Sequence, residues 1–411
     1  MTEFSRRRML AGIGATAAAG AVTLTPAAAN ATGLPRTDGW VGSWGTASVT
    51  GVAPDGYPNY SIRSLVHLSI GGSAVRIRLS NAFGAEPVVM GHVTVAIAAG
   101  PDTPTAVAGS MRDLTFGGQR SITVPVGSDV LSDPADLRVP AASNLLVTTY
   151  VPSPSGPVTY HPDAQQDSFF TNAGDFADDE TGTPYNQTTQ VWHYVNQVDV
   201  FAPGARGAVV AFGDSITDGY QSTWGANHRW PDYLAGRILT HGGGLGVLNA
   251  GIGGNRLLLD GGPVNAGFGV NALARFDRDV LAKTAARTMI VLLGINDIQQ
   301  DPHQTDPTQI IAAHQQLITQ AHSRGLRALG GTITPFKGWT DYDATLEATR
   351  TAVNTWIRSS GAYDGVVDFD AAVRDPADPQ AMLPAYDSGD HLHPKDAGYQ
   401  AMANAVPLGS L

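Results

Sequence analysis

The sequence contains no cysteine, and this absence excludes several kinds of chemistry. Without Cys among its 411 residues, the chain has no disulfide bonds, no thiolate metal site and no thiol nucleophile. Covalent catalysis would therefore depend on a Ser or Thr hydroxyl. Stability must come from a packed core, and a chain of this length in which 43% of the residues are hydrophobic can bury one.

Positive charge is also scarce. The chain has 25 Lys and Arg residues against 36 Asp and Glu residues, which gives a formal net charge of −11. Nucleic acids and anionic membranes both attract basic surfaces, so this balance argues against either as a partner. No run of Lys or Arg occurs outside the first ten residues.

Long apolar runs are absent as well. The stretch from Met9 to about Leu24 is rich in Ala and Gly and is too short for a convincing membrane-spanning helix. It follows the basic "SRRRML" and precedes Ala27-Ala28-Ala29, which is the layout of a cleaved export signal. We therefore expect residues 1–29 to be a signal of the twin-arginine type, with a secreted bacterial protein after cleavage; a membrane anchor or a disordered tail is the alternative.

Short strands without helices are expected from residue 37 to residue 202. Alternating or β-branched runs, each bounded by Gly, Pro, Asn or Ser, predict an all-β sandwich or jelly-roll-like domain. They are "SLVHLSIGG", "AVRIRLSN", "HVTVAIAAG", "RSITVPVG" and "NLLVTTYVP". Residues 152–190 are polar and rich in Gly, Pro, Asn and Thr, which predicts long surface loops.

Four aromatic residues of this domain have two interpretations. They could form a platform on which a polysaccharide stacks, or they could be buried in the core of the sandwich, which is the commoner place for such residues. The four are Trp40, Trp44, Trp192 and Tyr194.

The pattern changes after "PGARG" at residues 203–207. From residue 207 to residue 411, apolar strands alternate with amphipathic segments, which predicts an α/β domain with a parallel sheet. The strands are "AVVAF", "GVLNAG", "TMIVLLG", "RALGGTIT" and "GVVDFD". Helices are expected at residues 231–240 and 345–358, and a helical stripe from Ile310 to Ala321 predicts a third.

Four polar clusters occur at strand ends of this domain or before its last helix. Since the carboxyl ends of parallel strands meet at one edge of the sheet, all four clusters could line one cleft. They are Gly213-Asp214-Ser215, "NAGIGGNR" at residues 249–256, "GIND" at residues 294–297 and "DHLHP" at residues 390–394.

These clusters contain what ester hydrolysis at a serine requires. Ser215 supplies a hydroxyl, and Asp390 and His393 are three residues apart, so that both side chains can lie on one side of an irregular turn. Ser215 N–H, Gly254 N–H and the Asn296 amide could form an oxyanion hole. Taken singly, such residues more often belong to a turn or a helix cap than to a catalytic site; the four clusters together favour catalysis.

The four clusters, in this order, resemble blocks I, II, III and V of the SGNH or GDSL hydrolase superfamily, although the sequence reads GDSI where the family name has GDSL. The resemblance covers about half the chain. It implies a three-layer α/β/α flavodoxin-like domain with Ser215 as the nucleophile and Asp390 and His393 completing the triad. It also implies Gly254 and Asn296 as oxyanion donors, with Gly251 and Gly253 as the alternatives to Gly254.

The remaining side chains give little support for a metal or a cofactor. The histidines show no zinc-type spacing, and Asp368 and Asp370 alone are too few oxygen ligands for a cation. Neither Gly-rich loop has the spacing of a nucleotide-binding motif. We expect Asp214 and Asp297 to brace their loops through backbone hydrogen bonds, and His391 to be exposed.

The sequence therefore predicts a secreted serine esterase that needs no cofactor and acts on acetyl or short-chain acyl esters. The β-rich front half followed by this hydrolase domain also resembles exported bacterial arylesterases and acylhydrolases linked to xylan breakdown. The substrate could then be a carbohydrate ester, a short-chain lipid ester or an aryl ester. The acyl pocket depends on the loops at residues 221–229, 260–271 and 297–306, in which Phe268 could form a wall. A carbohydrate-binding protein with an inactive hydrolase-like domain is the alternative of a different class; the oligomeric state is open.

Overall fold

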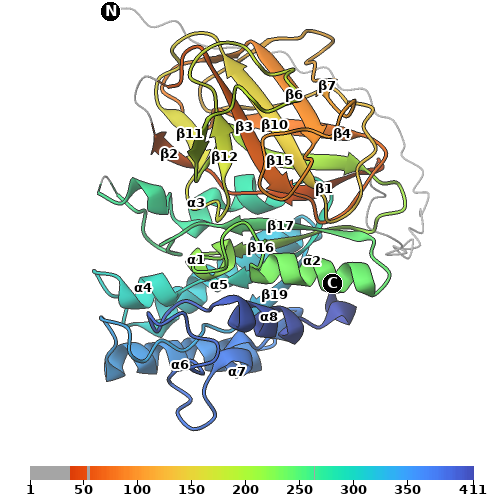
Figure 1. Cartoon of the computed structure of the whole chain (residues 1–411). Helices are drawn as coiled ribbons and strands as arrows, with labels where there is room; N and C mark the ends of the chain where they lie inside the picture. The colour runs from red at the N-terminus through yellow and green to blue at the C-terminus, as the bar shows by residue number, and fades with distance from the viewer. Residues whose placement is uncertain (1–37, 53–55, 263) are drawn as a thin grey trace, which may run out of the picture. The chain divides into compact units, whose positions relative to one another are not determined.

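The computed structural model describes residues 38–52, 56–262 and 264–411 (Figure 1). The predicted export signal at residues 1–29 lies outside the described residues. No helix in the described ranges is long and apolar enough to cross a membrane.

Antiparallel strands make up the described chain from residue 38 to residue 202, which contains no helix. The larger sheet has the order β13-β12-β3-β10-β6-β7 and the other β1-β15-β4-β9, and their inner faces bury side chains such as Val66, Ile77 and Val198 in one core. These two sheets confirm the expected β-domain. The larger sheet consists of β3 (Tyr60–His67), β6 (His92–Ile97), β7 (Arg112–Asp113), β10 (Asn144–Val151), β12 (Ser168–Phe170) and β13 (Gln187–Thr189), and the other of β1 (Trp40–Gly45), β4 (Val75–Ser80), β9 (Asp129–Leu131) and β15 (Val195–Phe201).

Two small sheets complete this part of the fold. One has the order β14-β11-β2, and the other pairs β5 with β8. The strands are β2 (Val49–Val52), β5 (Val88–Met90), β8 (Ile122–Val124), β11 (Val158–His161) and β14 (Trp192–His193).

The prediction of long surface loops over residues 152–190 is wrong in part. The segment contains β11, β12 and β13, and several of its polar side chains are buried with hydrogen-bond partners. Gln166, for example, is 2% exposed and donates from Nε2 to the carbonyl oxygen of Leu65 over 2.6 Å. Polar residues can occupy a core when each finds such a partner, and composition alone does not reveal the partner.

A five-stranded parallel sheet forms the centre of the second half of the chain (Figure 1). Its order is β17-β16-β18-β19-β20, so the second strand in the chain flanks the first and the others follow on the opposite side. This flavodoxin-like order confirms the expected fold, and it places a ligand-binding crevice at the carboxyl end of β16, where the order reverses. The strands are β16 (Gly207–Gly213), β17 (Leu245–Gly251), β18 (Ala286–Leu292), β19 (Arg327–Gly331) and β20 (Gly365–Val367).

Helices cover the sheet in two groups, which gives the expected three layers. In one group α2 packs against β17 and α8, and α8 against α7; in the other α5 packs against β19, α3 and α6. The expected helices at residues 231–240 and 345–358 are confirmed within a residue at each end, and the stripe that ends at Ala321 lies on α5. The helices are α1 (Ser215–Asp218), α2 (Trp230–Thr240), α3 (Ala272–Phe276), α4 (Ile295–Gln299), α5 (Pro307–Ser323), α6 (Ala344–Ser359), α7 (Phe369–Val373) and α8 (Asp396–Ala405), with the short turns η1 (Ala266–Phe268), η2 (Asp277–Leu281, a π-helix) and η3 (Leu408–Ser410).

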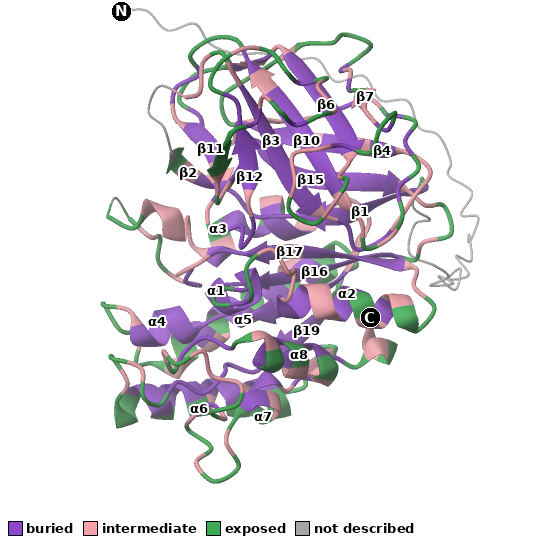
Figure 2. Ribbon diagram, viewed as in Figure 1, coloured by how far each residue is buried: buried purple, intermediate pink, exposed green. Residues whose placement is uncertain are grey.

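The antiparallel part packs directly on the parallel sheet. Strand β1 lies against β17, where a Cβ on Gly246 would be 1.9 Å from the carbonyl oxygen of Gly42, so only glycine allows this approach. The Ser69 hydroxyl accepts a hydrogen bond from Val247 N–H, and the buried Lys283 ammonium donates to the Thr46 carbonyl oxygen. The two parts share one hydrophobic core, and Figure 2 shows buried residues running from the antiparallel strands into β16 and β17.

Candidate active site

Ser215 begins α1 immediately after β16, at the switch point of the parallel sheet. Asp214 caps this short helix, because its Oδ1 accepts a hydrogen bond from Ile216 N–H over 3.0 Å. Burial raises the pKa of Asp214 to about 7, and the charge of Asp297 adds to the effect. The cap confirms that Asp214 braces its loop, and it holds the Ser215 hydroxyl at the end of the strand.

Ser215, His393 and Asp390 form a continuous hydrogen-bonded chain. Ser215 Oγ is 2.8 Å from His393 Nε2, and His393 Nδ1 is 2.7 Å from Asp390 Oδ2. A carboxylate can only accept, so Nδ1 carries the proton and Nε2 offers its lone pair to the Ser215 hydroxyl. Both Ser215 and His393 are less than 10% exposed. The arrangement can deprotonate the serine as it attacks an ester.

Several hydrogen bonds fix the orientation of Asp390. Its Oδ1 accepts from Leu392 N–H over 2.9 Å and from His393 N–H over 2.8 Å. Burial alone would raise the pKa of Asp390, but the hydrogen bonds from the His393 side chain and backbone hold it well below its usual range. The carboxylate therefore stays ionised and stabilises an imidazolium at His393.

Asn296, the second residue of α4, directs its amide into the same site. Its Oδ1 accepts from Gln299 Nε2 over 2.8 Å and from Gln300 Nε2 over 3.0 Å, so the orientation of the amide is determined by two donors. One N–H of its Nδ2 goes to the Asn255 carbonyl oxygen over 3.1 Å. The other is available to a negatively charged oxygen on a substrate.

Hydrogen bonding in the glycine loop after β17 distinguishes the three candidate glycines. Gly251 N–H already donates to Asn249 Oδ1 over 2.9 Å, whereas Gly253 and Gly254 line the pocket that contains Ser215 and have no acceptor among the described residues. Gly254 has a φ of +71°, and a Cβ there would lie 2.4 Å from the Phe268 ring. The loop can therefore bring unobstructed N–H groups to the site only with glycine.

Two buried side chains, Asp297 and Arg275, support these loops, and the sequence predicted this role only for Asp297. Asp297 accepts from the N–H groups of Leu257 and Leu258 over 2.8 and 3.0 Å, as expected for a brace, and burial raises its pKa to about 6. Arg275 had no sequence signal. Its guanidinium is fully buried and donates to the Gly213 and Ala250 carbonyl oxygens, which ties the ends of β16 and β17 together.

A pocket of about 310 Å³ is lined by Ser215, Gly253, Gly254, Asn296 and His393, but not by Asp390. The expected wall residue Phe268 lines it, and Gln299 and Gln300 come from the expected loop at residues 297–306. The sequence did not indicate several further lining residues. They are Asp163, Tyr220, Trp339 and Leu392, of which Tyr220 and Trp339 place their rings edge-on to His393 with centroids 4.8 and 6.3 Å away.

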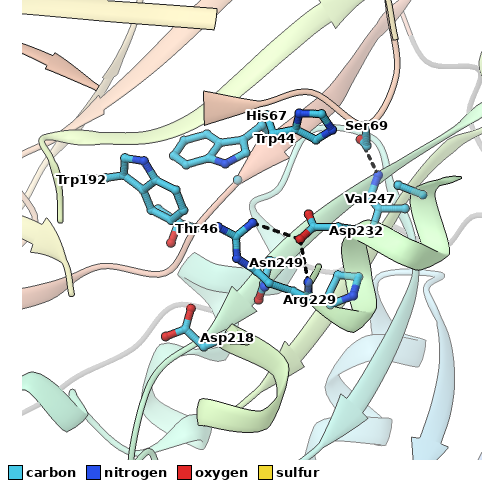
Figure 3. Close-up of a pocket in the computed structure, with 13 residues that line it drawn as sticks. Trp44, Thr46, His67, Ser69, Trp192, Asp218, Arg229, Asp232, Val247 and Asn249 are labelled. Carbon is cyan, nitrogen blue, oxygen red and sulfur yellow. Dashed lines mark hydrogen bonds and ion pairs between the residues drawn. The ribbon is translucent and has the colours of Figure 1, made fainter. Parts of the chain in front are cut away.

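A second, much smaller cavity of about 30 Å³ lies beside Trp44 and Trp192 (Figure 3). It has room for about one water molecule. Its serine and histidine do not pair with each other, since Ser69 bonds to Ser43 and His67 to Asn144. This cavity is a packing gap beside the Arg229–Asp232 ion pair, and it contains no serine–histidine pair that could act in hydrolysis.

The aromatic platform on the β-domain is contradicted by the structure. All four of its residues are less than 10% exposed. Trp44 packs edge-on to Trp192 at 5.0 Å, and both line the small cavity beside Arg229. Asp368 and Asp370 bind Arg358 instead of forming a cation site. His391 is exposed, as expected, and pairs with Asp387 over 2.6 Å.

The sequence from residue 211 to residue 401 matches the model of the GDSL-like Lipase/Acylhydrolase family. Residues 211–401 are thus a domain of the SGNH/GDSL hydrolase superfamily. This GDSL domain contains Ser215, Gly254, Asn296, Asp390 and His393, and it makes the chain a carboxylic ester hydrolase. No curated protein matches the sequence.

Solved structures of GDSL proteins align with about half of the chain. A G-D-S-L family protein from Desulfitobacterium hafniense is 21% identical, with 48% of this chain and 96% of that chain covered and a TM-score of 0.37. A carbohydrate acetylesterase from Sinorhizobium meliloti is 16% identical (48% and 95% covered, TM-score 0.38). An aryl esterase from M. smegmatis is also 16% identical (48% and 95% covered, TM-score 0.39).

Proposed function

We propose that this GDSL hydrolase is an exported serine esterase that cleaves acetyl or short-chain acyl esters through a Ser215–His393–Asp390 triad. The single observation that carries the proposal is the hydrogen-bonded chain from Ser215 Oγ through His393 to Asp390 at the switch point of the sheet. Export rests on the sequence of residues 1–29 alone.

The first half of the reaction forms an acyl-enzyme. As Ser215 Oγ attacks the ester carbonyl carbon, its proton passes to His393 Nε2, and the carbonyl electrons move to oxygen. The resulting oxyanion lies against Ser215 N–H, Gly254 N–H and the free Nδ2–H of Asn296. When the intermediate collapses, the alcohol leaves with the proton from His393 Nε2, and the acyl group stays on Ser215.

The second half reverses these steps with water. Water attacks the acyl carbon while His393 Nε2 takes its proton, and collapse of the second intermediate returns that proton to Ser215 Oγ and releases the acid. Asp390 remains ionised throughout, which keeps the charged imidazole oriented. The chain's own groups therefore complete the cycle.

Replacing Asn296 with alanine tests the oxyanion hole. The loss of one donor in a preorganised site lowers kcat by about 10²-fold, because the oxyanion loses a hydrogen bond that the ground state does not need to the same degree. We expect kcat for p-nitrophenyl acetate to fall by this amount in Asn296→Ala, with a much smaller change in KM. An unchanged kcat, or an effect confined to KM, would remove Asn296 from the mechanism.

The acyl-chain preference tests the proposed substrate class. The pocket holds both the acyl group and the reacting atoms in about 310 Å³, and Phe268 and Trp339 lie on its walls. Among p-nitrophenyl esters from acetate to octanoate, we expect kcat/KM to be highest at acetate or butyrate. A maximum at octanoate would contradict a short-chain esterase and favour a lipase.

A binding protein with an inactive hydrolase-like domain has less support. The nucleophile, base and carboxylate are all present and hydrogen-bonded, and the aromatic residues that suggested a sugar platform are buried. These two observations support catalysis over this alternative.

A further inference from the structure

One wall of the active-site pocket comes from the β-domain. Asp163 lines the pocket together with Ser215, His393 and Asn296, and it is the lining residue that lies outside the GDSL domain of residues 211–401. It follows β11 in the segment that the sequence predicted to be a surface loop.

The loop that holds Asp163 is fastened to the helix of the nucleophile. His161 Nε2 is 3.0 Å from Asp218 Oδ1, at the end of α1, and His161 Nδ1 is 2.6 Å from the Ala47 carbonyl oxygen. Since both partners accept, both ring nitrogens carry protons. Burial disfavours a charged His161, but Asp218, the Ala47 carbonyl and the charge of Asp163 together outweigh burial, so that the pKa of His161 is raised. A buried ion pair therefore ties this loop to α1.

Two backbone groups of the same loop are bound from the other side. Arg229 Nη2 donates to the Ala164 carbonyl oxygen over 2.6 Å, and Gly225 N–H donates to the Gln165 carbonyl oxygen over 2.9 Å. With the ion pair before Asp163 and these two bonds after it, the position of Asp163 in the pocket is fixed by the GDSL domain itself.

The Asp163 carboxylate is exposed and accepts no hydrogen bond from any of the described residues. Its charged neighbours are Asp218 and His161. Its Oδ2 lies 3.3 Å from the place that a Cβ on Gly253 would occupy, so it borders the glycine loop of the oxyanion site. Its φ of +54° is unfavourable for most residues, although Asp and Asn tolerate it. Desolvation and the nearby Asp218 raise its pKa.

We propose that Asp163 is a specificity-determining residue of the esterase site, whose carboxylate accepts a hydrogen bond from a donor group on the substrate. Hydroxyl and ammonium groups both supply that chemistry. The β-domain thereby contributes directly to substrate selection by the GDSL domain. This inference rests on the proposed esterase function.

Two pairs of matched esters test the proposal. Glycerol 1-monoacetate and propyl acetate differ in the hydroxyl groups of the alcohol. The second pair is 3-aminopropyl acetate and butyl acetate, in which an ammonium group with N–H donors replaces the terminal methyl group. For each pair the measured quantity is the ratio of kcat/KM for the donor-bearing or charged ester to that for its apolar partner. The pair whose ratio changes in the Asp163 variants shows whether the substrate group bound by Asp163 is a hydroxyl or an ammonium.

Asp163→Gly and Asp163→Asn are suitable variants because both residues tolerate the positive φ at this position. Glycine removes the acceptor, and asparagine keeps a neutral one. Because a hydrogen bond to a charged group is stronger than one to a neutral group, we expect the ratio to fall about tenfold or more in Asp163→Gly and by less in Asp163→Asn.

The controls separate this inference from the esterase mechanism. Asp178→Asn removes an exposed β-domain carboxylate that lines a different pocket, and it should leave both ratios unchanged. If the ratios stay constant for both ester pairs in both Asp163 variants, the proposed role of Asp163 is wrong, and the esterase mechanism is unaffected. Propyl acetate hydrolysis that persists in Ser215→Ala would instead contradict the proposed function, and this inference with it.

Discussion

Ser215→Ala is expected to lower kcat for p-nitrophenyl acetate by roughly 10⁴-fold or more, which is the scale found when a triad nucleophile is removed. No other group in the structure can replace the hydroxyl, because Ser215 Oγ is the one described serine oxygen within hydrogen-bond distance of His393 Nε2. Residual activity would come from the oxyanion donors and substrate binding alone. Steady-state kinetics on the purified variant gives the measurement.

Ser222→Ala is the matched control for this variant. Ser222 is 7% exposed, lies seven residues after the nucleophile, and its hydroxyl makes no hydrogen bond among the described residues. Its removal should leave kcat nearly unchanged. Equal losses in the two variants would show that the effect at Ser215 is structural, and wild-type turnover in Ser215→Ala would disprove the mechanism.

His393→Asn is expected to have an effect of similar size. Without the imidazole, no base takes the serine proton and no acid protonates the leaving alcohol, so kcat should again fall by roughly 10⁴-fold or more. The same substitution at His391 is a close control, because that histidine lies two residues away, is exposed, and pairs with Asp387. Asparagine also tolerates the φ of +67° at His391.

The comparison of the two histidine variants distinguishes catalysis from folding. We expect His391→Asn to keep kcat within about threefold of the wild type. Substitutions of exposed residues outside the core and the catalytic site usually change the stability of a protein only slightly. If both variants lose activity equally, activity depends on the conformation of the loop at residues 390–394 and not on the His393 imidazole as a base. If His393→Asn keeps its activity, the serine must be activated by another group.

Much of the fold could be predicted from periodicity. The apolar strands of the parallel sheet and the helices α2, α5 and α6 have clear patterns, since one buried face repeats along each element. The segment at residues 152–190 was misjudged because its buried polar residues, such as Gln166, take partners from strands about a hundred positions away. Composition within the segment contains no information about such partners.

The residues of the candidate site also divide into those that the local sequence indicates and those that depend on tertiary contacts. Ser215, Asn296, Asp390 and His393 stand at strand ends or in a short polar motif, where residue type and position indicate chemistry. The glycine loop was harder, because the distinction among its glycines depends on which N–H is already bonded, as at Gly251.

Two further residues were not predictable from local patterns. Arg275 looks like a helix surface residue in sequence, and only the topology places it beneath β16 and β17. Asp163 reaches the pocket because the β-domain folds against α1, a contact between segments about fifty residues apart. In both cases the tertiary arrangement, and not the local sequence, gives the side chain its role.

Labelling with a fluorophosphonate, followed by peptide mapping, tests whether Ser215 is an activated nucleophile. The reagent phosphonylates a serine only when a base activates the hydroxyl and donors stabilise the new oxyanion, so it reports on the whole arrangement and not on one residue. We expect one label per chain, on Ser215, and no label on Ser215→Ala. A protein that does not react, or a label on a different serine, would contradict this role of Ser215.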